Sequence, residues 1–299
     1  MLPLPADDGS NRMSSILTPS AAKMRQPWAL KDLPPFRPVA LKLVRLTAKE
    51  DIPIGEVLQV LRMDVAFSAE VLRFANSALI SSRSGVNNLA HAVEILGLEQ
   101  LKALSMTIAL RDLLSTSKTN GFVQQCWRYN LATAIVCEWL AGFLPLEADV
   151  CYTAGLVHDI GLLALLRGFP KEYELATAAI ASFDFDLLRC ERDAFHIDHC
   201  EAGRWLMQRW EFPPELQEVA ALHHLQPGPD MPPLVTVVYT GWQIADMLGF
   251  SPLATRSALS VEEIIGSLPE PAREKILARL DELAALVARK VNAAESSRP

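Results

Sequence analysis

The sequence predicts an all-α fold in which an N-terminal helical bundle lobe packs on a second, C-terminal helical lobe. Three observations lead to this prediction. Apolar residues recur at intervals of three and four along most of the chain, as on amphipathic helices. Ser, Asp and Asn stand where these segments begin, and Gly or Pro stands near their ends. We find no convincing pair of strands joined by a hairpin turn and no repeat of fixed period.

The first lobe is expected over residues 31–114, after a Ser- and Pro-rich mobile leader at 1–30. Its ordered part should begin at the Pro-rich turn of LPPFRPVALKLVRLTAK, which precedes a helix. The short amphipathic segment PIGEVLQVLRM follows. Asp64 is a candidate N-cap for DVAFSAEVLRFANSA. The apolar face of this helix should comprise Val65, Ala69, Leu72 and Ala75 or Asn76.

Two further helices should complete the first lobe. NNLAHAVEILG starts at an Asn and should stop at Gly97, because glycine commonly ends helices. LEQLKALSMTIALRDLL continues with apolar residues at helical spacing. In RFANSA, Asn76 is expected to end its helix and bind nearby backbone groups, although a contact surface or hinge is an alternative. The polar STSKTNGF should then connect the lobes.

The second lobe is expected over residues 120–250. It should contain two long helices, FVQQCWRYNLATAIVCEWLAGFL and LEADVCYTAGLVHDIGLLALLRG, separated by a turn at Pro145. DHCEAGRWLMQRW opens with Asp198 and has Glu201 three residues later, as in a capping box. PPELQEVAALHH and PPLVTVVYTGWQIADMLG begin with prolines, which a helix tolerates there. The second of these is too long for a typical strand.

A helical extension is expected over residues 251–299. SVEEIIGSLP has the Ser-x-x-Glu start of a helix, and EPAREKILARLDELAALVARKV predicts one long helix. Its apolar stripe comprises Ile276, Leu280, Leu283, Val287 and Val291. We expect this stripe to pack back on the bundle, and a homodimer seam is the alternative.

Composition narrows the function. The net charge of −7 argues against a nucleic-acid partner, since such proteins neutralise phosphates with Lys and Arg. The five cysteines form no CxxC pair, so a reducing, cytoplasmic location is expected. The N-terminus does not resemble a signal peptide. We expect neither a membrane helix, which needs roughly 20 apolar residues, nor a membrane partner, because the longest apolar run is interrupted by His158 and Asp159.

Metal-capable side chains concentrate in the second lobe, which holds five of the six histidines. The run AGLVHDIGLLALL places His158 beside Asp159 in what reads as a buried helix. Imidazole and carboxylate together suit Zn, Fe, Mn or Ni. Adjacent helical residues point about 100° apart, so other helices of the bundle would have to supply further ligands. The alternative is a polar core in which these groups bond one another without a metal.

Several segments in order resemble the HDOD family, the HD-related output domain of the HD phosphohydrolases. They are LPPFRPVALKLVRL, MDVAFSAEVLRFANSA, NNLAHAVEILGLEQLKALSMTIAL, CWRYNLATAIVCEWLA, AGLVHDIGLLAL and DHCEAGRWLMQRWEFPPELQEVAALHH. The resemblance covers roughly 220 residues. It implies that the second lobe is HD-like. It also implies a possible single-metal site with six candidate ligands: His158, Asp159, His199, His223, His224 and Asp246.

The sequence departs from an active HD site at two positions. Tyr129, in WRYN, stands where the superfamily has its first ligand histidine, and a phenol is a poor substitute for imidazole. Leu162 follows HDIG where related cyclic-dinucleotide phosphodiesterases have a phosphate-binding lysine. The resemblance therefore implies a degenerate site with no certain cofactor, or at most one divalent ion.

The expected function is a bacterial, non-catalytic signal-transduction module that binds unidentified signalling proteins. The alternative is a metal-dependent phosphohydrolase acting on a nucleotide or cyclic dinucleotide, with the same six side chains as ligands. The two losses at Tyr129 and Leu162 favour the first function, since hydrolysis needs an activated water and positive charge on the phosphate.

Overall fold

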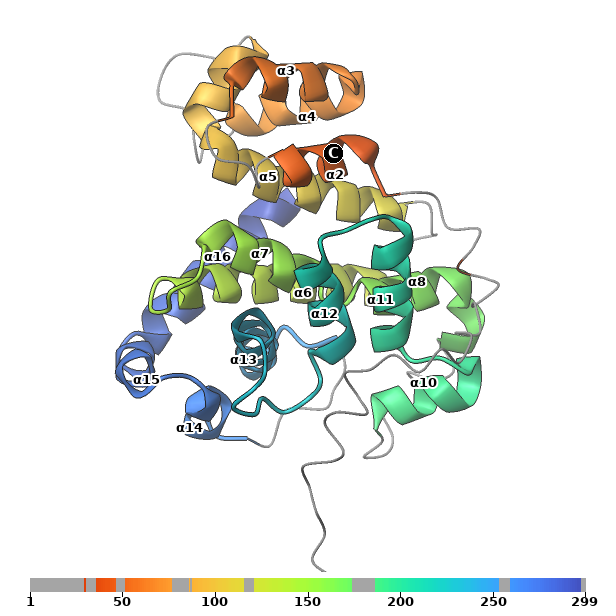
Figure 1. Cartoon of the computed structure of the whole chain (residues 1–299), viewed down its shortest axis with the longest axis vertical. Helices are drawn as coiled ribbons and strands as arrows, with labels where there is room; N and C mark the ends of the chain where they lie inside the picture. Colours follow the sequence, from red (N-terminus) through yellow and green to blue (C-terminus); the bar gives the residue numbers. More distant parts are fainter. Residues whose placement is uncertain are drawn as a thin grey trace, which may run out of the picture.

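The computed structural model of this chain describes residues 30, 36–46, 52–76, 86, 88–115, 121–173, 186–252 and 259–296. These residues form fourteen α-helices and no strand, which confirms the predicted all-α class (Figure 1). Apart from Leu30, the leader predicted at 1–30 lies outside the described residues. The predicted connection STSKTNGF also lies mostly outside them.

The N-terminal helices share one cluster of buried apolar side chains. They are α2 (Pro38–Leu46), α3 (Ile54–Arg62), α4 (Val65–Ala75) and the kinked α5 (Leu89–Ser115). The cluster includes Leu43, Leu61, Phe67 and Leu101, all fully buried. Two of these helices, α2 and α5, also contribute residues such as Val44 and Met106 to a second cluster. These helices therefore bury two faces each.

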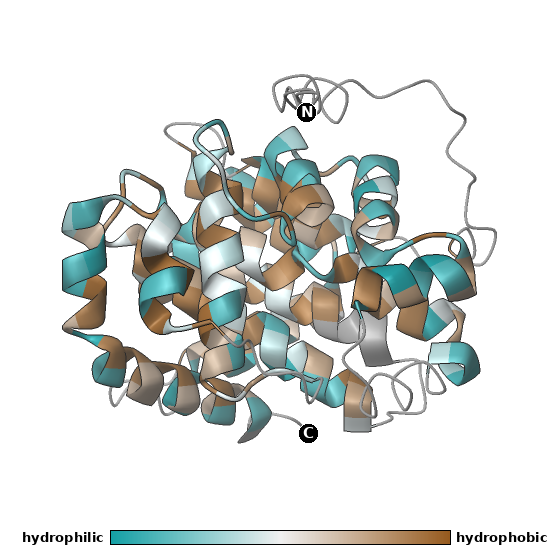
Figure 2. Cartoon of the chain, turned by 90° about the horizontal axis from the view of Figure 1, so that it is seen from below, coloured by the Kyte–Doolittle hydropathy of each residue, from teal (hydrophilic) through white to brown (hydrophobic). Residues whose placement is uncertain are grey.

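The second, larger cluster is formed by the remaining helices. They are α6 (Gly121–Ala141), α7 (Ala148–Val157), α8 (Ile160–Gly168), α10 (Leu187–Phe195), α11 (His199–Arg209), α12 (Pro214–Leu222) and α13 (Pro233–Met247), then α14 (Val261–Ile264), η2 (Ile265–Ser267), α15 (Glu270–Leu277) and α16 (Leu280–Ser296). Figure 2 shows that hydrophobic residues gather toward the centre of the molecule.

Polar caps fix several helix starts as predicted. Asp64 accepts a hydrogen bond from the Phe67 backbone N–H at 3.0 Å, and Asp198 accepts one from Glu201 at 2.9 Å. Ser260 and Glu263 form a complete capping box. These bonds satisfy N–H groups that have no partner within the helix.

The apolar face of α4 differs from the prediction. Val65 is 82% exposed, whereas Phe67, Val71 and Ala75 are fully buried. These three residues repeat every fourth position, so they form one stripe of the helix. The prediction was wrong for Val65 and right for Ala75, which belongs to this stripe.

Gly97 interrupts α5, as predicted, but the chain resumes a helix immediately afterwards. Its φ of 72° lies in the left-handed region, which glycine adopts without steric cost. The two halves of α5 therefore meet at a kink rather than across a loop.

Two other long helices predicted from the sequence are each broken in two. The helix expected over LEADVCYTAGLVHDIGLLALLRG stops after Val157 and restarts at Ile160 as α8. The helix expected near the C-terminus is divided between Leu277 and Leu280. The apolar stretch Ala148–Gly168 is also long and apolar enough to span a membrane, contrary to the expectation. However, 83% of its most apolar window is buried inside the fold, as in a core helix.

The C-terminal helix α16 packs on α6 (Figure 1). Leu283, Val287 and Val291 are fully buried there, and Lys290 Nζ lies 2.7 Å from Glu138 Oε2. The prediction that this stripe packs back on the bundle is confirmed. A homodimer remains an untested prediction.

The residues that follow α11 make aromatic contacts with Phe36, just before α2, and an ionic contact with Arg45 in α2. The Phe36 ring lies 5.8 Å from that of Trp210 and 5.3 Å from that of Phe212. Arg45 Nη2 donates to the backbone oxygen of Glu211 at 2.7 Å and to its carboxylate at 2.9 Å. Glu211 has a φ of 55°, a conformation unusual for a residue with a side chain. The guanidinium thus holds an unfavourable backbone turn in place.

Asn76 binds backbone groups, as expected, and joins two distant points of the chain. Its Nδ2 donates to Leu72 O at 2.8 Å and to Val86 O at 2.7 Å, while its Oδ1 accepts from Val86 N at 2.7 Å. The side chain therefore pairs with Val86 as a neighbouring strand would.

Replacing Asn76 with alanine should lower the free energy of unfolding by about 1–2 kcal/mol, because three hydrogen bonds are lost at an exposed position. Urea denaturation of the full chain measures this loss. Asn76→Asp keeps the acceptor for the Val86 N–H and removes both donations, so it should lie between alanine and wild type. An Asn76→Ala variant as stable as wild type would contradict this account.

Candidate metal centre

The break between α7 and α8 places His158 and Asp159 at a turn. His158 is the C-cap of α7 and Asp159 is the N-cap of α8. The His158 ring binds the carbonyl of Gly155 through Nδ1 at 2.7 Å, which fixes the ring against the last turn of α7. The two neighbouring side chains are thus not restricted to the 100° separation of a continuous helix. The sequence-based interpretation of a continuous helix was wrong at this point.

Imidazoles from three elements converge on the Asp159 carboxylate. His223 Nε2 lies 3.2 Å and His199 Nε2 lies 3.4 Å from Asp159 Oδ1, while His158 Nε2 lies 3.7 Å from Oδ2. The three histidines are 1% exposed and Asp159 is 5% exposed. The cluster is therefore almost sealed from solvent.

Each of these imidazoles uses its other nitrogen for a partner outside the cluster. His158 Nδ1 faces the Gly155 carbonyl, and His223 Nδ1 lies 3.0 Å from the Ala220 carbonyl. His199 Nδ1 lies 2.7 Å from Glu191 Oε2. An imidazole that donates through Nδ1 carries a lone pair at Nε2 when neutral. The outer partners therefore turn lone pairs inward, which is how metal-binding histidines are commonly oriented.

The inward atoms lack hydrogen-bond partners. Asp159 Oδ1, His199 Nε2 and His223 Nε2 are buried and form no hydrogen bond of acceptable geometry. Facing acceptors repel unless a proton or a cation lies between them. Ligands about 2.1 Å from one tetrahedral ion are about 3.4 Å apart, close to the 3.2 and 3.4 Å separations here. The arrangement suits one ion.

Burial and charge determine the protonation of the cluster. Burial alone would raise the pKa of Asp159, but the imidazoles of His158, His223 and His199 outweigh it and hold that pKa below its usual value. Burial lowers the pKa of His158 to about 4, so this imidazole is neutral at pH 7. Burial alone would lower the pKa of His199. The Glu191 carboxylate outweighs this effect, so the pKa of His199 is raised. Without a metal, a proton on His199 can therefore supply the required positive charge.

Glu191 on α10 supports His199, and it was not among the site residues predicted from the sequence. It is 1% exposed, and its Oε2 accepts from both His199 Nδ1 and the His199 backbone N–H, at 2.7 and 2.8 Å. Tyr173 donates its hydroxyl to the other carboxylate oxygen at 2.5 Å. Burial and the Glu191 charge raise the pKa of Tyr173, so this hydroxyl keeps its proton. The carboxylate thus has three donors and stays buried at moderate cost.

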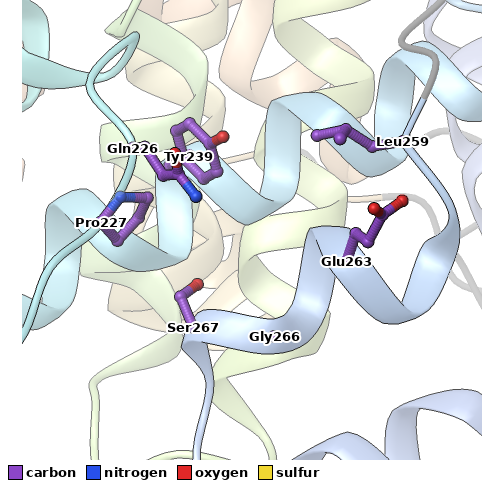
Figure 3. A pocket seen from close by; sticks show the side chains of 7 residues that line it. All are labelled: Gln226, Pro227, Tyr239, Leu259, Glu263, Gly266 and Ser267. Atoms are coloured by element: carbon purple, nitrogen blue, oxygen red, sulfur yellow. The ribbon is translucent and has the colours of Figure 1, made fainter.

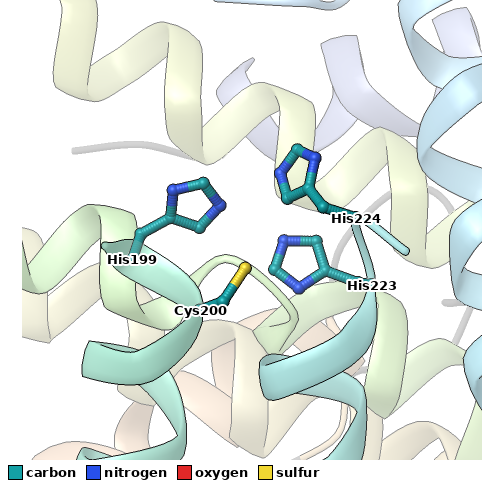
Figure 4. Close-up of side chains that lie close together, drawn as sticks. All are labelled: His199, Cys200, His223 and His224. Carbon is teal, nitrogen blue, oxygen red and sulfur yellow. The ribbon is translucent and has the colours of Figure 1, made fainter. Parts of the chain in front are cut away.

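Cys200 is a second group that the sequence-based prediction missed. It follows His199 in the first turn of α11, and its thiol is grouped with the rings of His199, His223 and His224 (Figure 4). One ligand atom from each of the four lies within 4.8 Å of every other. The signal available in the sequence was a thiol directly beside a candidate ligand histidine.

Tyr129 and Asp246 lie at the edge of the cluster. The Tyr129 ring is 5.9 Å from that of His158, and its hydroxyl donates to the Trp242 carbonyl at 3.4 Å. Burial and the Asp159 and Asp246 carboxylates raise the pKa of Tyr129 well above its usual value, so it remains a neutral phenol. Asp246 on α13 is buried but belongs to neither group of metal-capable side chains among the described residues.

The six predicted ligands are therefore only partly brought together. His158, Asp159 and His223 form one group, and His199 and His224 join His223 in the other. His223 is shared, so the two groups are adjacent. Tyr129, which stands where the first ligand histidine was expected, offers a protonated phenol. The ligand set itself remains a prediction.

A cavity of about 370 Å³ lies away from this cluster, between α13 and α14 (Figure 3). Gln226, Tyr239 and Glu263 are among its lining residues, and none of the predicted ligands is. A molecule bound there would not touch the metal-capable groups.

The helical fold places a His-Asp pair at a helix break, with histidines from α11 and from the end of α12 around it. The sequence matches the HDOD domain over residues 33–226. The chain therefore belongs to the HDOD domain family, as its sequence motifs indicated.

Similar proteins come from several bacteria. A solved HDOD domain protein of unknown function from Geobacter sulfurreducens has a TM-score of 0.66 and 22% identity, with 86% of this chain and 92% of that chain covered. A structure from Marinobacter aquaeolei VT8, whose name suggests a signal transduction protein, has a TM-score of 0.67 and 23% identity over 87% of this chain and 60% of that one.

Two further bacterial proteins are similar to this chain. A structure from Shewanella amazonensis SB2B, whose name suggests a phosphohydrolase, has a TM-score of 0.61 and 24% identity over 90% of this chain and 93% of that one. An uncharacterized protein of Treponema pallidum (strain Nichols) is 24% identical over 229 residues, which are 75% of this chain. The matched region covers 44% of that relative, less than half of its length. The solved structures support the fold at these identities.

Proposed function

We propose that this protein is a non-catalytic bacterial signal-transduction module that acts in the cytoplasm by binding signalling proteins. The observation that carries the proposal is the burial of the polar cluster. A phosphate ester must reach a metal and its activated water, yet Asp159, His199 and His223 are 1–5% exposed. The structural relative whose name suggests signal transduction agrees with this proposal.

The two departures from an active HD site support the same function. The Tyr129 hydroxyl is directed to a backbone carbonyl of α13 and keeps its proton. Leu162 is 3% exposed and lies in the apolar cluster, so it offers a phosphate neither charge nor a hydrogen bond. A pocket with these groups has lost part of the charge that stabilises a phosphoryl transition state.

The proposed organisation has two lobes, at 31–114 and 120–250, and an extension at 251–299. The two clusters of buried apolar residues support this division, since one of them is formed only by residues of the N-terminal helices and the segments beside them, although α2 and α5 also contribute to the other. Surfaces of the lobes would then be available for partner proteins, and a homodimer is one such assembly.

A metal-dependent phosphohydrolase is the second candidate function. The observation that favours it is the convergence of partnerless acceptors from Asp159, His199 and His223, which suits a divalent ion. The Shewanella relative bears a name of this kind.

Hydrolysis assays separate the two functions. The full chain, supplied in turn with Mn²⁺, Fe²⁺, Ni²⁺ and Zn²⁺, should turn over bis(p-nitrophenyl) phosphate and cyclic dinucleotides no faster than its Asp159→Ala variant. This result is expected because a sealed site excludes these substrates. Turnover by the wild type that disappears in the Asp159→Ala variant would overturn the proposed function and establish the second candidate.

A further inference from the structure

We propose that His199, Cys200, His223 and His224 form a closed site for one zinc ion, with three imidazole nitrogens and one thiolate as ligands. This inference goes beyond the proposed function, because such a site would stabilise the fold whether or not the protein hydrolyses an ester. It also differs from the six ligands expected from the sequence, since it includes Cys200 and excludes His158, Asp159 and Asp246.

The four ligands come as two adjacent pairs from two packed helices. His199 and Cys200 open α11, while His223 and His224 follow the last residue of α12. The pairs face one another (Figure 4), and all four ligand atoms lie within 4.8 Å of each other. Bonds of about 2.0 Å to nitrogen and 2.3 Å to sulfur require separations of about 3.3–3.5 Å between the ligand atoms of a tetrahedral ion. Small rotations of the side chains would bring the four atoms to that distance.

The helix packing leaves little freedom in the position of the first pair. Helices α8 and α11 approach so closely at Gly161 that an added Cβ would lie 1.9 Å from the His199 carbonyl oxygen. Glu191 holds the His199 ring from the opposite side at 2.7 Å. A site whose ligands are fixed before the metal arrives loses little conformational entropy on binding.

Two buried imidazole nitrogens of this group, which also face Asp159 Oδ1, lack a hydrogen-bond partner. His199 Nε2 and His223 Nε2 belong to residues that are 1% exposed, and neither forms a hydrogen bond of acceptable geometry. Their Nδ1 atoms are held by Glu191 and by the Ala220 carbonyl, as in the carboxylate–histidine–zinc arrangement. A Lewis acid would satisfy both lone pairs at once.

Cys200 decides the kind of metal. A thiolate is a soft ligand that favours zinc over magnesium, calcium or manganese, and three imidazoles with one thiolate give tetrahedral coordination. The thiol lies in a residue that is 7% exposed, beside His199. Binding replaces the thiol proton by the metal, and that proton passes to solvent. Four protein ligands leave no position open for water, which is typical of structural zinc sites.

The Cys200 group and the Asp159 group cannot both be loaded. They share His223, and one imidazole nitrogen binds one ion. A soft ion should select the group that contains Cys200, and a harder ion the group that contains Asp159. The Asp159 carboxylate, next to the site, would then compensate part of the ion's charge.

Cobalt(II) binding tests the site, since Co²⁺ replaces zinc and has a visible spectrum. Full-length protein is freed of metal by chelation and titrated with Co²⁺. The expected result is one equivalent bound, with the intense d–d bands of a tetrahedral site and a thiolate-to-cobalt charge-transfer band that zinc abolishes. Cys200→Ser should remove the charge-transfer band and weaken zinc binding more than about 100-fold, beyond the effect of losing an outer partner.

Matched variants identify the ligands. Cys190→Ser changes a half-buried cysteine of α10 outside the site and should leave the spectrum unchanged. Asp159→Asn should keep the charge-transfer band, because its carboxylate is not a ligand of this site. If Cys200→Ser does not fold, X-ray absorption of the zinc-loaded wild type still tests the proposal, which requires one sulfur in the shell.

Three results would overturn the proposal. They are the absence of stoichiometric binding, binding without a charge-transfer band, and a charge-transfer band that persists in Cys200→Ser. Because these measurements involve no turnover, their failure leaves the proposed signalling function unaffected. Turnover in the hydrolysis assay, in turn, says nothing about the sulfur ligand.

Discussion

Replacing Gly161 with alanine should lower the free energy of unfolding by roughly 3 kcal/mol or more, the upper range for overpacking a core. A Cβ at this position would lie 1.9 Å from His199 O and 2.5 Å from Gly203 N. Both are backbone atoms of α11, so no side-chain rotation relieves the clash, and α8 must move away from α11. Chemical denaturation followed by circular dichroism measures the loss.

Gly55→Ala is the matched control for this substitution. Gly55 is an exposed helical glycine of α3, and an added Cβ there meets nothing within 4 Å. The control should be neutral or stabilise the protein by about 0.4–1 kcal/mol, because alanine loses less backbone entropy on folding. Equal stability of Gly161→Ala and wild type would show that α8 and α11 are not packed this closely.

Glu191→Ala should destabilise the protein by about 3–5 kcal/mol, the range for removing one partner of a buried charged group. The carboxylate is 1% exposed and accepts from the His199 backbone N–H, from His199 Nδ1 and from the Tyr173 hydroxyl. Its removal leaves three buried donors without a partner. A thermal scan should show a correspondingly lower Tm.

Two comparisons identify the cause of that loss. Glu191→Gln keeps one acceptor oxygen and should lose less than the alanine variant. Glu282→Ala removes an exposed carboxylate, whose side chain is 63% accessible and pairs with Arg279 at 2.8 Å, and should cost less than about 1 kcal/mol. Similar losses for Glu191→Ala and Glu282→Ala would contradict a buried supporting role for Glu191.

Helix existence and most helix starts could be predicted from the sequence because their causes are local. Asp64, Asp198 and Ser260 each cap a helix a few residues further along the chain. Gly97 interrupts its helix because its own backbone adopts a positive φ. The Asp and Ser caps and the Gly kink depend on neighbours within about one turn.

The break between α7 and α8 could not be predicted in this way. The sequence VHDIG contains no proline, and its glycine stands after the break, so local signals favour a continuous helix. At this turn Asp159 faces His199 and His223, which lie 40 and 64 residues later in the chain, at 3.4 and 3.2 Å. Packing between distant segments outweighs local propensity here.

The candidate site could be predicted in its histidines but not in its supporting groups. The resemblance supplied His158, Asp159, His199 and His223, which do converge. Glu191 carries no motif, and its role follows from how α10 places it under α11. Cys200 becomes a candidate ligand because α11 and α12 bring it to His223 and His224. These contacts between distant residues depend on how the helices pack, and the sequence spacing does not determine them.

Helix α11 joins two environments that are far apart. Its first turn holds His199 in the polar cluster, and the residues just past its last turn, Trp210 and Glu211, are held by Phe36 and Arg45. Eleven residues of α-helix extend about 16 Å. This one helix therefore connects the histidine-rich centre of the molecule with the contacts at Phe36 and Arg45.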